Sequence, residues 1–96
     1  MKKIDFEKHV LSIYGVMPDK PFDEDFTTEV FRVKGSKKWF AIYMSVPPEK
    51  FGLSGDKEDV VNLKCPPELS ADFIDNLSVF PAYHMNKTHW VSVLLS

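Results

Sequence analysis

The chain has 96 residues, of which 44% are hydrophobic and 14% aromatic, and its formal net charge at neutral pH is −2. This length fits one small domain, and the composition excludes an intrinsically disordered protein. No apolar run approaches the roughly 20 residues that span a bilayer, and the basic N-terminus lacks the apolar segment of a secretory signal. The single cysteine, Cys65, cannot form an internal disulfide, so we expect a reduced, cytoplasmic protein.

The first quarter of the chain predicts an amphipathic helix. Over residues 5–17 the apolar side chains fall on one helical stripe, formed by Phe6, Val10, Ile13, Tyr14 and Met17. Asp5 is a candidate N-cap, and Gly15 and Pro18 weaken the helix at its end. A turn-rich acidic segment, residues 18–25, follows.

Residues 26–46 predict a β-hairpin. β-forming residues over 26–34 run into a turn at 34–37, and residues 39–46 alternate as a second strand. One face of this strand is purely apolar, with Phe40, Ile42, Met44 and Val46, and the other carries Trp39, Ala41, Tyr43 and Ser45. Pro47 and Pro48 end the strand, because proline cannot donate to a strand ladder, and a loop over 47–58 follows.

The second half of the chain predicts a strand, a helix and a strand. Residues 58–65 alternate, with Val61, Leu63 and Cys65 on one face. Pro66 and Pro67 then open a helix whose core stripe is Leu69, Phe73 and Leu77, with Ile74 beside it. Residues 89–95 form the last strand. This order predicts an α+β fold, a two-layer sandwich with the helices on one face of a mainly antiparallel sheet.

Such a sheet can leave its second face in water. If the helices cover the apolar face of residues 40–46, the opposite face would present Trp39, Tyr43, Asn62 and Lys64. Aromatic, amide and ammonium groups together are typical of a ligand-binding surface. The alternative is that the chain's own C-terminal part, or a partner subunit, covers these side chains.

Patterns for catalysis and for metal binding are weak. His84 and His89 lie five residues apart and would not share a helix face, so no metal site is expected. Cys65 alternates onto an apolar strand face, which favours a buried structural thiol over a nucleophile. No phosphate-binding loop or acid–base pair stands out. We therefore predict a protein that is not an enzyme and that needs no cofactor.

Residues 81–90 concentrate hydrogen-bonding side chains. Within ten positions they hold six candidates for a site: Tyr83, His84, Asn86, Lys87, His89 and Trp90. Lys87, His89 and the Asn86 amide could donate to an anion, while an aromatic ring could stack on a base. The alternative is structural: His84 and Asn86 would bond backbone groups of the loop, and Trp90 would fill the core. The sequence leaves both open.

The same stretch carries a family resemblance. Together with Lys64-Cys65-Pro66-Pro67-Glu68, the strand start Lys38-Trp39-Phe40-Ala41, and the opening segments 14–16 and 19–22, it resembles the MmcQ/YjbR family. The resemblance covers nearly the whole chain and implies one domain over 1–96 with a CyaY-like (frataxin-like, double-wing) fold. It also implies DNA binding. Members of this family usually continue into a C-terminal helix that this sequence lacks.

Two functions follow as hypotheses. In the first, the protein binds DNA. Residues 26–57 carry six basic groups against three acids, and the candidate contacts are Arg32, Lys34, Lys37, Lys38, Lys64 and Lys87, with Trp39 and Tyr43. In the second, residues 83–90 and Lys64 bind a small anionic ligand or a protein partner. The sequence does not determine the oligomeric state.

Overall fold

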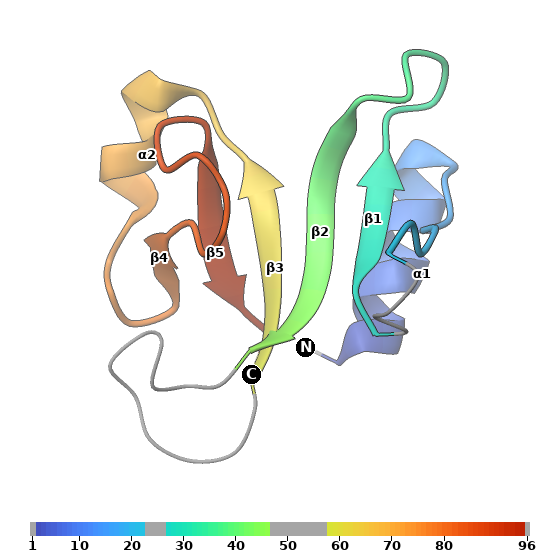
Figure 1. Ribbon diagram of the computed structural model, residues 1–96, viewed down its shortest axis with the longest axis horizontal. Coiled ribbons are helices and arrows are strands. Elements are labelled where there is room, and N and C mark those ends of the chain that lie inside the picture. Colours follow the sequence, from blue (N-terminus) through green and yellow to red (C-terminus); the bar gives the residue numbers. More distant parts are fainter. Residues whose placement is uncertain (1, 23–26, 47–57, 96) are drawn as a thin grey trace.

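The computed structural model describes residues 2–22, 27–46 and 58–95. Its elements are α1 (Lys3–Tyr14), β1 (Glu29–Arg32), β2 (Trp39–Val46), β3 (Glu58–Lys64), α2 (Pro67–Phe73), β4 (Val79–Pro81) and β5 (Trp90–Leu94). The strands form one antiparallel sheet in the order β1-β2-β3-β5-β4 (Figure 1). The predicted α+β fold is therefore confirmed. The predicted acidic run at 23–25 and most of the 47–58 loop lie outside the described residues.

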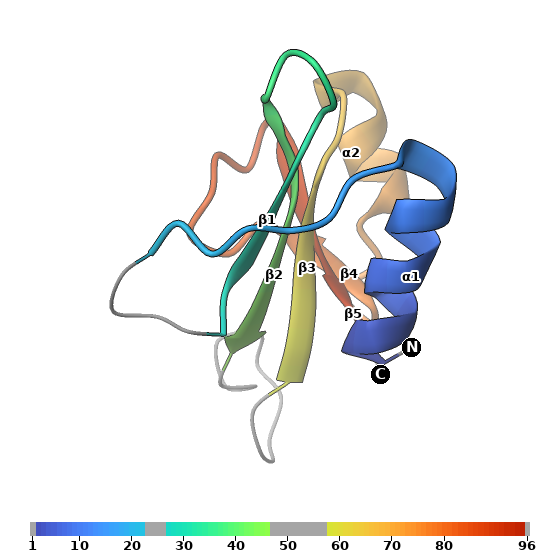
Figure 2. The same cartoon turned by 90° about the vertical axis from the view of Figure 1, so that its right-hand side faces the viewer.

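The sheet has a different cover on each face. Both helices lie on one face, and the chain that joins β4 to β5 lies on the other (Figure 2). On the helix face, α1 packs Phe6 and Val10 against Phe31, Tyr43 and Val61. The rings of Phe6 and Phe31 meet edge to face, with centroids 5.3 Å apart. The second face has its own core.

That second core is built by the segment before β5. Ala82, Met85 and Trp90 pack on Val30 and Ile42 there. The sheet is thus buried on both sides of its centre, by a helix on one side and by an irregular loop on the other. The chain's own C-terminal part, one of the two covers that the sequence left open, lies over Trp39 and Asn62 but not over Tyr43.

A β-bulge changes the predicted faces of β2. Phe31 pairs with Ala41 but Arg32 pairs with Trp39, so Phe40 is an extra residue in the ladder. As a result Phe40 joins the helix-side core, while Trp39 joins the opposite core with Ile42 and Met44. The sequence prediction grouped Phe40 with Ile42 and was wrong, because strict alternation does not hold across a bulge.

The prediction of an exposed ligand-binding face was also wrong. Tyr43 is 6% exposed under α1, and Asn62 is fully buried on the opposite face, where it pairs with Ile42. Trp39 is half-buried and only Lys64 is exposed. Both faces of β2 are apolar enough to be core, so the sequence pattern could not show which one the helix would cover.

The second helix departs most from the prediction. It ends at Phe73, and none of its residues is buried. The three side chains of its predicted core stripe are exposed instead: Leu69 (42%), Phe73 (54%) and Leu77 (79%). Ile13, Tyr14 and Met17 of the first predicted stripe are exposed as well. The helix face therefore retains apolar surface that residues 2–22, 27–46 and 58–95 leave exposed.

Element ends differ in smaller ways. The first helix begins at Lys3 with Lys2 as its N-cap, so Asp5 lies in the first turn and is not the cap. It ends at Tyr14 and is capped by Gly15, whose φ of 66° is a left-handed conformation that glycine adopts without steric cost. The short strand β4 was not predicted, because three residues that end in proline give almost no strand signal.

Candidate functional site

The predicted binding stretch, residues 81–90, is fixed to the sheet by a buried polar triangle. The Asn62 side-chain amide donates to the Tyr83 carbonyl (2.8 Å), and the Tyr83 N–H donates to the Ser92 hydroxyl (2.8 Å). Ser92 in turn donates to the Asn62 side-chain oxygen. Asn62 and Ser92 are both fully buried. Every corner has a partner, so the triangle anchors the loop rather than offering free groups to a ligand.

Further along the loop, polar groups bond within the chain. Lys87 Nζ donates to the Ala82 carbonyl at 2.9 Å, and the Asn86 side-chain oxygen accepts the Thr88 N–H at 2.8 Å. The His89 carbonyl accepts the N–H of Cys65 at 2.7 Å. These bonds close the loop on itself and tie it to the end of β3.

The ring side chains of the stretch differ in accessibility. Trp90 is buried in the core, with Lys64 Nζ 5.7 Å from its ring centre. His84 and His89 are exposed and Tyr83 is half-buried. His84 adopts a φ of 62°, and its ring lies 3.9 Å from that of Tyr83, centroid to centroid. Among the ring side chains of this stretch, the two imidazoles are therefore the ones that solvent can reach most freely.

The β1–β2 hairpin divides the predicted basic residues into two sets. Arg32 forms a two-pronged ion pair with Asp19 (2.9 and 3.0 Å) and lies over the ring of Trp39. This guanidinium lowers the pKa of Asp19. Arg32 and Trp39 are thus engaged within the chain. By contrast, Lys34, Lys37 and Lys38 are exposed in the turn.

Several exposed lysines gather at one end of the sheet. The 33–38 turn and the end of β3 both lie at this end, whereas the 84–89 loop lies apart from the turn, on the other side of β3 (Figure 1). Lys34 and Lys64 line one pocket, which confirms that the turn and the end of β3 are adjacent. The lysines of this basic end are Lys34, Lys37, Lys38 and Lys64. The structure therefore brings together four of the predicted contacts, from two separate segments, while Lys87 lies apart and is bonded within its own loop.

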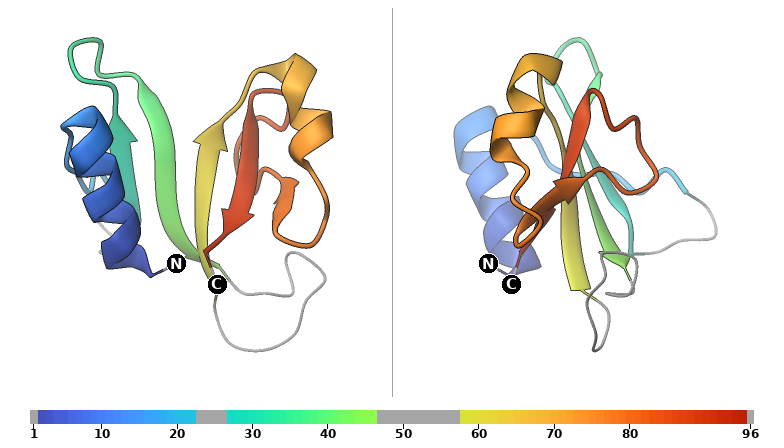
Figure 3. Two further views of the ribbon diagram at one scale, coloured as in Figure 1. Left: turned by 180° about the vertical axis from the view of Figure 1, so that it is seen from behind. Right: turned by 90° about the vertical axis from the view of Figure 1, so that its left-hand side faces the viewer.

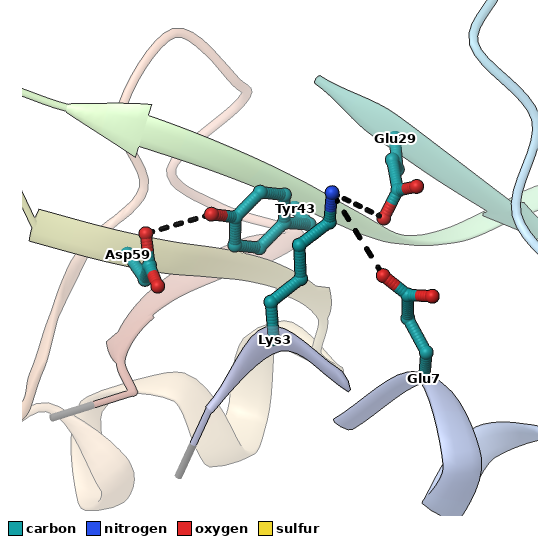
Figure 4. Close-up of polar contacts among 5 residues, drawn as sticks. All are labelled: Lys3, Glu7, Glu29, Tyr43 and Asp59. Atoms are coloured by element: carbon teal, nitrogen blue, oxygen red, sulfur yellow. Dashed lines mark hydrogen bonds and ion pairs between the residues drawn. The ribbon is translucent and has the colours of Figure 1, made fainter. Parts of the chain in front are cut away.

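The opposite end of the sheet carries a polar cluster that the sequence analysis did not identify (Figure 4). Tyr43 donates a 2.7 Å hydrogen bond to Asp59, and Lys3 Nζ lies 3.6 Å from Glu29 and 3.9 Å from Glu7. Burial and the Asp59 carboxylate raise the pKa of Tyr43. The Lys3–Glu7 spacing of four residues was the only sequence signal, since the other groups come from three different strands.

Glu29 is a buried carboxylate of this end of the sheet, which we call the acidic end. It is 6% exposed, and one of its carboxylate oxygens has no hydrogen-bond partner in the described structure. Burial raises the pKa of Glu29, and the neighbouring Glu7 raises it further, while Lys3 opposes the change. The clusters at the two ends of the sheet therefore differ in charge: one consists of lysines, and the other holds Glu7, Glu29 and Asp59 with the single cation Lys3.

The described residues contain neither a metal-binding cluster nor a membrane-spanning helix. No group of three His, Cys, Asp or Glu side chains there is arranged to hold a metal ion. No helix in that part of the chain is long and apolar enough to cross a membrane. Cys65 is buried at the end of β3 and is not in a disulfide.

Comparison with known proteins places the chain among uncharacterised bacterial relatives. Residues 11–96 match the sequence model of the YjbR family. The uncharacterised protein YyaQ of Bacillus subtilis is 44% identical over 92 residues, which cover 95% of this chain and 78% of YyaQ.

Solved structures agree with that match. A crystal structure of a Pseudomonas syringae protein is 40% identical, with a TM-score of 0.92 over 99% of this chain and 82% of that one. A Deinococcus radiodurans protein with a DUF419 domain is 29% identical, with a TM-score of 0.70 over 100% of this chain and 65% of that one. The chain therefore belongs to the YjbR family.

Proposed function

We propose that this protein binds nucleic acid, with DNA as the first candidate, through the basic end of the sheet. One observation carries the proposal: four exposed lysines from two separate segments, the 33–38 turn and the end of β3, share that end. Lysines contact phosphate without reading sequence, so the proposal concerns backbone binding. A frataxin-like classification and a cytoplasmic setting are further parts of this proposal.

The net charge of −2 is compatible with such binding because the charges are separated. Glu29 and Asp59 lie at the starts of β1 and β3, whereas the lysines lie where these strands end. At physiological salt, screening limits the electrostatic interactions of each exposed charge to a range of about 8 Å. A phosphate at the basic end would therefore interact mainly with the lysines and little with the distant carboxylates.

A salt titration tests the proposal. Fluorescence anisotropy of a labelled duplex and a labelled single strand would be measured over a range of salt concentrations. If the four lysines contact phosphates of a duplex, the slope of log affinity against log salt approaches about −3.6, at about −0.9 per contact. Substituting Lys34, Lys37 and Lys38 by Ala should reduce that slope by more than half.

The control substitutes three exposed lysines elsewhere, Lys2, Lys8 and Lys20, by Ala. This variant makes the same change in net charge and should keep the wild-type slope. Equal losses in both triple variants, or no binding by the wild type at low salt, would contradict the proposal. The alternative, a small-ligand or protein site at residues 83–90, has less support because its Asn86 and Lys87 side chains already bond within the loop.

A further inference from the structure

An apolar trough crosses the helix face of the sheet between α1 and α2. It consists of three adjoining pockets, of about 640, 340 and 290 Å³, and Leu63 of β3 lines all three. The first two pockets share Phe6 and His9 of α1, and the third reaches Phe73 of α2. Figure 3 shows the two helices apart, with strands of the sheet between them. An exposed apolar surface of this kind marks an interaction site.

The charged side chains that line the trough are basic. Lys34, Lys64 and His9 line its first pocket, and none of the described residues that line the three pockets is acidic. An occupant should therefore be apolar along one side and should carry carboxylates.

The segment 67–78 of this same chain has that chemistry. It holds three acids, Glu68, Asp72 and Asp75, and no lysine or arginine. It also exposes Leu69, Phe73 and Leu77, and no residue of α2 is buried. The segment borders the trough and lies on the same face of the sheet (Figure 2).

We propose that the occupant is a second copy of the chain, in a two-fold symmetric dimer. The α2 segment of each copy would lie in the trough of the other, so that the two α2 segments are neighbours across the axis. Such an interface uses the same patch on both copies, which requires the patch to be self-complementary. Here the apolar side chains of α2 would meet the trough, and Glu68 and Asp72 would meet Lys34 and Lys64. The dimer does not rest on nucleic-acid binding, but it would engage Lys34 and Lys64 of the basic end, so these two lysines would not be free for phosphate in the dimer.

Charge reversal gives a test that needs no nucleic acid. Wild-type protein should sediment as a dimer at high micromolar concentration. A trough variant, Lys34→Glu with Lys64→Glu, and a helix variant, Glu68→Lys with Asp72→Lys, should each be monomeric, with self-association weakened on the order of a hundredfold, because like charges would face each other. Mixed one to one, the two variants should form a heterodimer, because both contacts are then between opposite charges.

A matched pair of leucines controls for a general effect of surface charge. Leu69 and Leu11 are exposed to a similar extent, 42% and 45%, and lie on α2 and α1. Leu11 lines none of the three pockets. Leu69→Glu should abolish the dimer, and Leu11→Glu should leave it intact, with folding of both verified by circular dichroism. A monomeric wild type overturns the proposal, and so does a dimer that persists in the charge-reversed variants.

Discussion

Asn62 and Ser92 lie opposite each other on β3 and β5, and the Ser92 hydroxyl donates a hydrogen bond to the Asn62 side chain. Both are fully buried, and both also bond the backbone of Tyr83. Two polar residues in the middle of a sheet thus hold the loop that covers its second face. This relationship explains why residues 81–90 are rich in polar groups without forming a free binding site.

The first prediction concerns this anchor. Asn62→Ala removes one bond each from the Ser92 hydroxyl and the Tyr83 carbonyl. Leaving buried polar groups unpaired costs about 1–3 kcal/mol each, so the free energy of unfolding should fall by about 2–4 kcal/mol. Urea denaturation measures it. Ser70→Ala, which removes an exposed hydroxyl bond to Pro67, should change the free energy by less than about 0.5 kcal/mol. Equal effects of the two substitutions would contradict the anchoring role.

A second prediction uses the raised pKa of Glu29. A carboxyl whose pKa is raised on folding stabilises the folded state below its unfolded pKa, and this contribution is lost as pH rises through the folded value. Deprotonation of Glu29 as the pH rises places a negative charge in a buried position near Glu7. Glu29→Gln removes that charge while keeping the shape of the side chain.

The expected result is an effect that depends on pH. Relative to wild type, Glu29→Gln should be more stable at pH 8 than at pH 4, when urea midpoints are compared. Lys3→Gln removes the cation beside Glu29. This variant should therefore lose more stability than wild type as the pH rises. If the difference between Glu29→Gln and wild type is the same at both pH values, the pKa of Glu29 is not raised in the folded protein and the prediction is wrong.

A third prediction concerns Tyr43. Burial and its bond to Asp59 raise the pKa of this phenol above its ordinary value of about 10. The resulting stabilisation is complete below pH 10 and is lost as pH rises above it, because the unfolded chain ionises first. Tyr43→Phe should thus cost stability at pH 7, by about 1 kcal/mol for the lost hydrogen bond. Its stability should fall less steeply than that of wild type above pH 10, which thermal unfolding at several pH values would show.

The sequence located the elements well where local chemistry decides them. Residues 39–46 were predicted as a strand and are one, because a glycine turn and a proline pair bound an apolar alternation. The faces were harder, since the bulge at Phe40 depends on pairing with β1. The cover over each face depends on tertiary packing, which placed Tyr43 under α1 and Asn62 under the loop.

The candidate site was predicted only in part, for a similar reason. The lysines of the 34–38 turn are adjacent in sequence, and any hairpin would expose them. Their proximity to Lys64, however, depends on strand order. The acidic end was missed because Lys3, Glu29, Tyr43 and Asp59 come from four elements. Pairing of distant segments, rather than residue type, created both clusters.

The last prediction concerns Asp75, which follows α2 and precedes β4. One carboxylate oxygen of Asp75 accepts the backbone N–H groups of Leu77, Ser78 and Val79, each at 2.9 Å. These bonds lower the pKa of Asp75, the bond from Val79 most of all. A lowered pKa means that the stabilisation is present above about pH 4 and is lost as pH falls.

Asp75→Ala should therefore loosen the turn that connects α2 to the sheet edge. Amide hydrogen exchange at residues 77–79 should be faster than in wild type at pH 6, and the difference should shrink as the pH is lowered. Asp72→Ala, an exposed carboxylate on α2 itself, serves as the matched control and should leave these amides unchanged. Exchange that accelerates equally in both variants would assign the effect to the charge of the segment and not to the three hydrogen bonds.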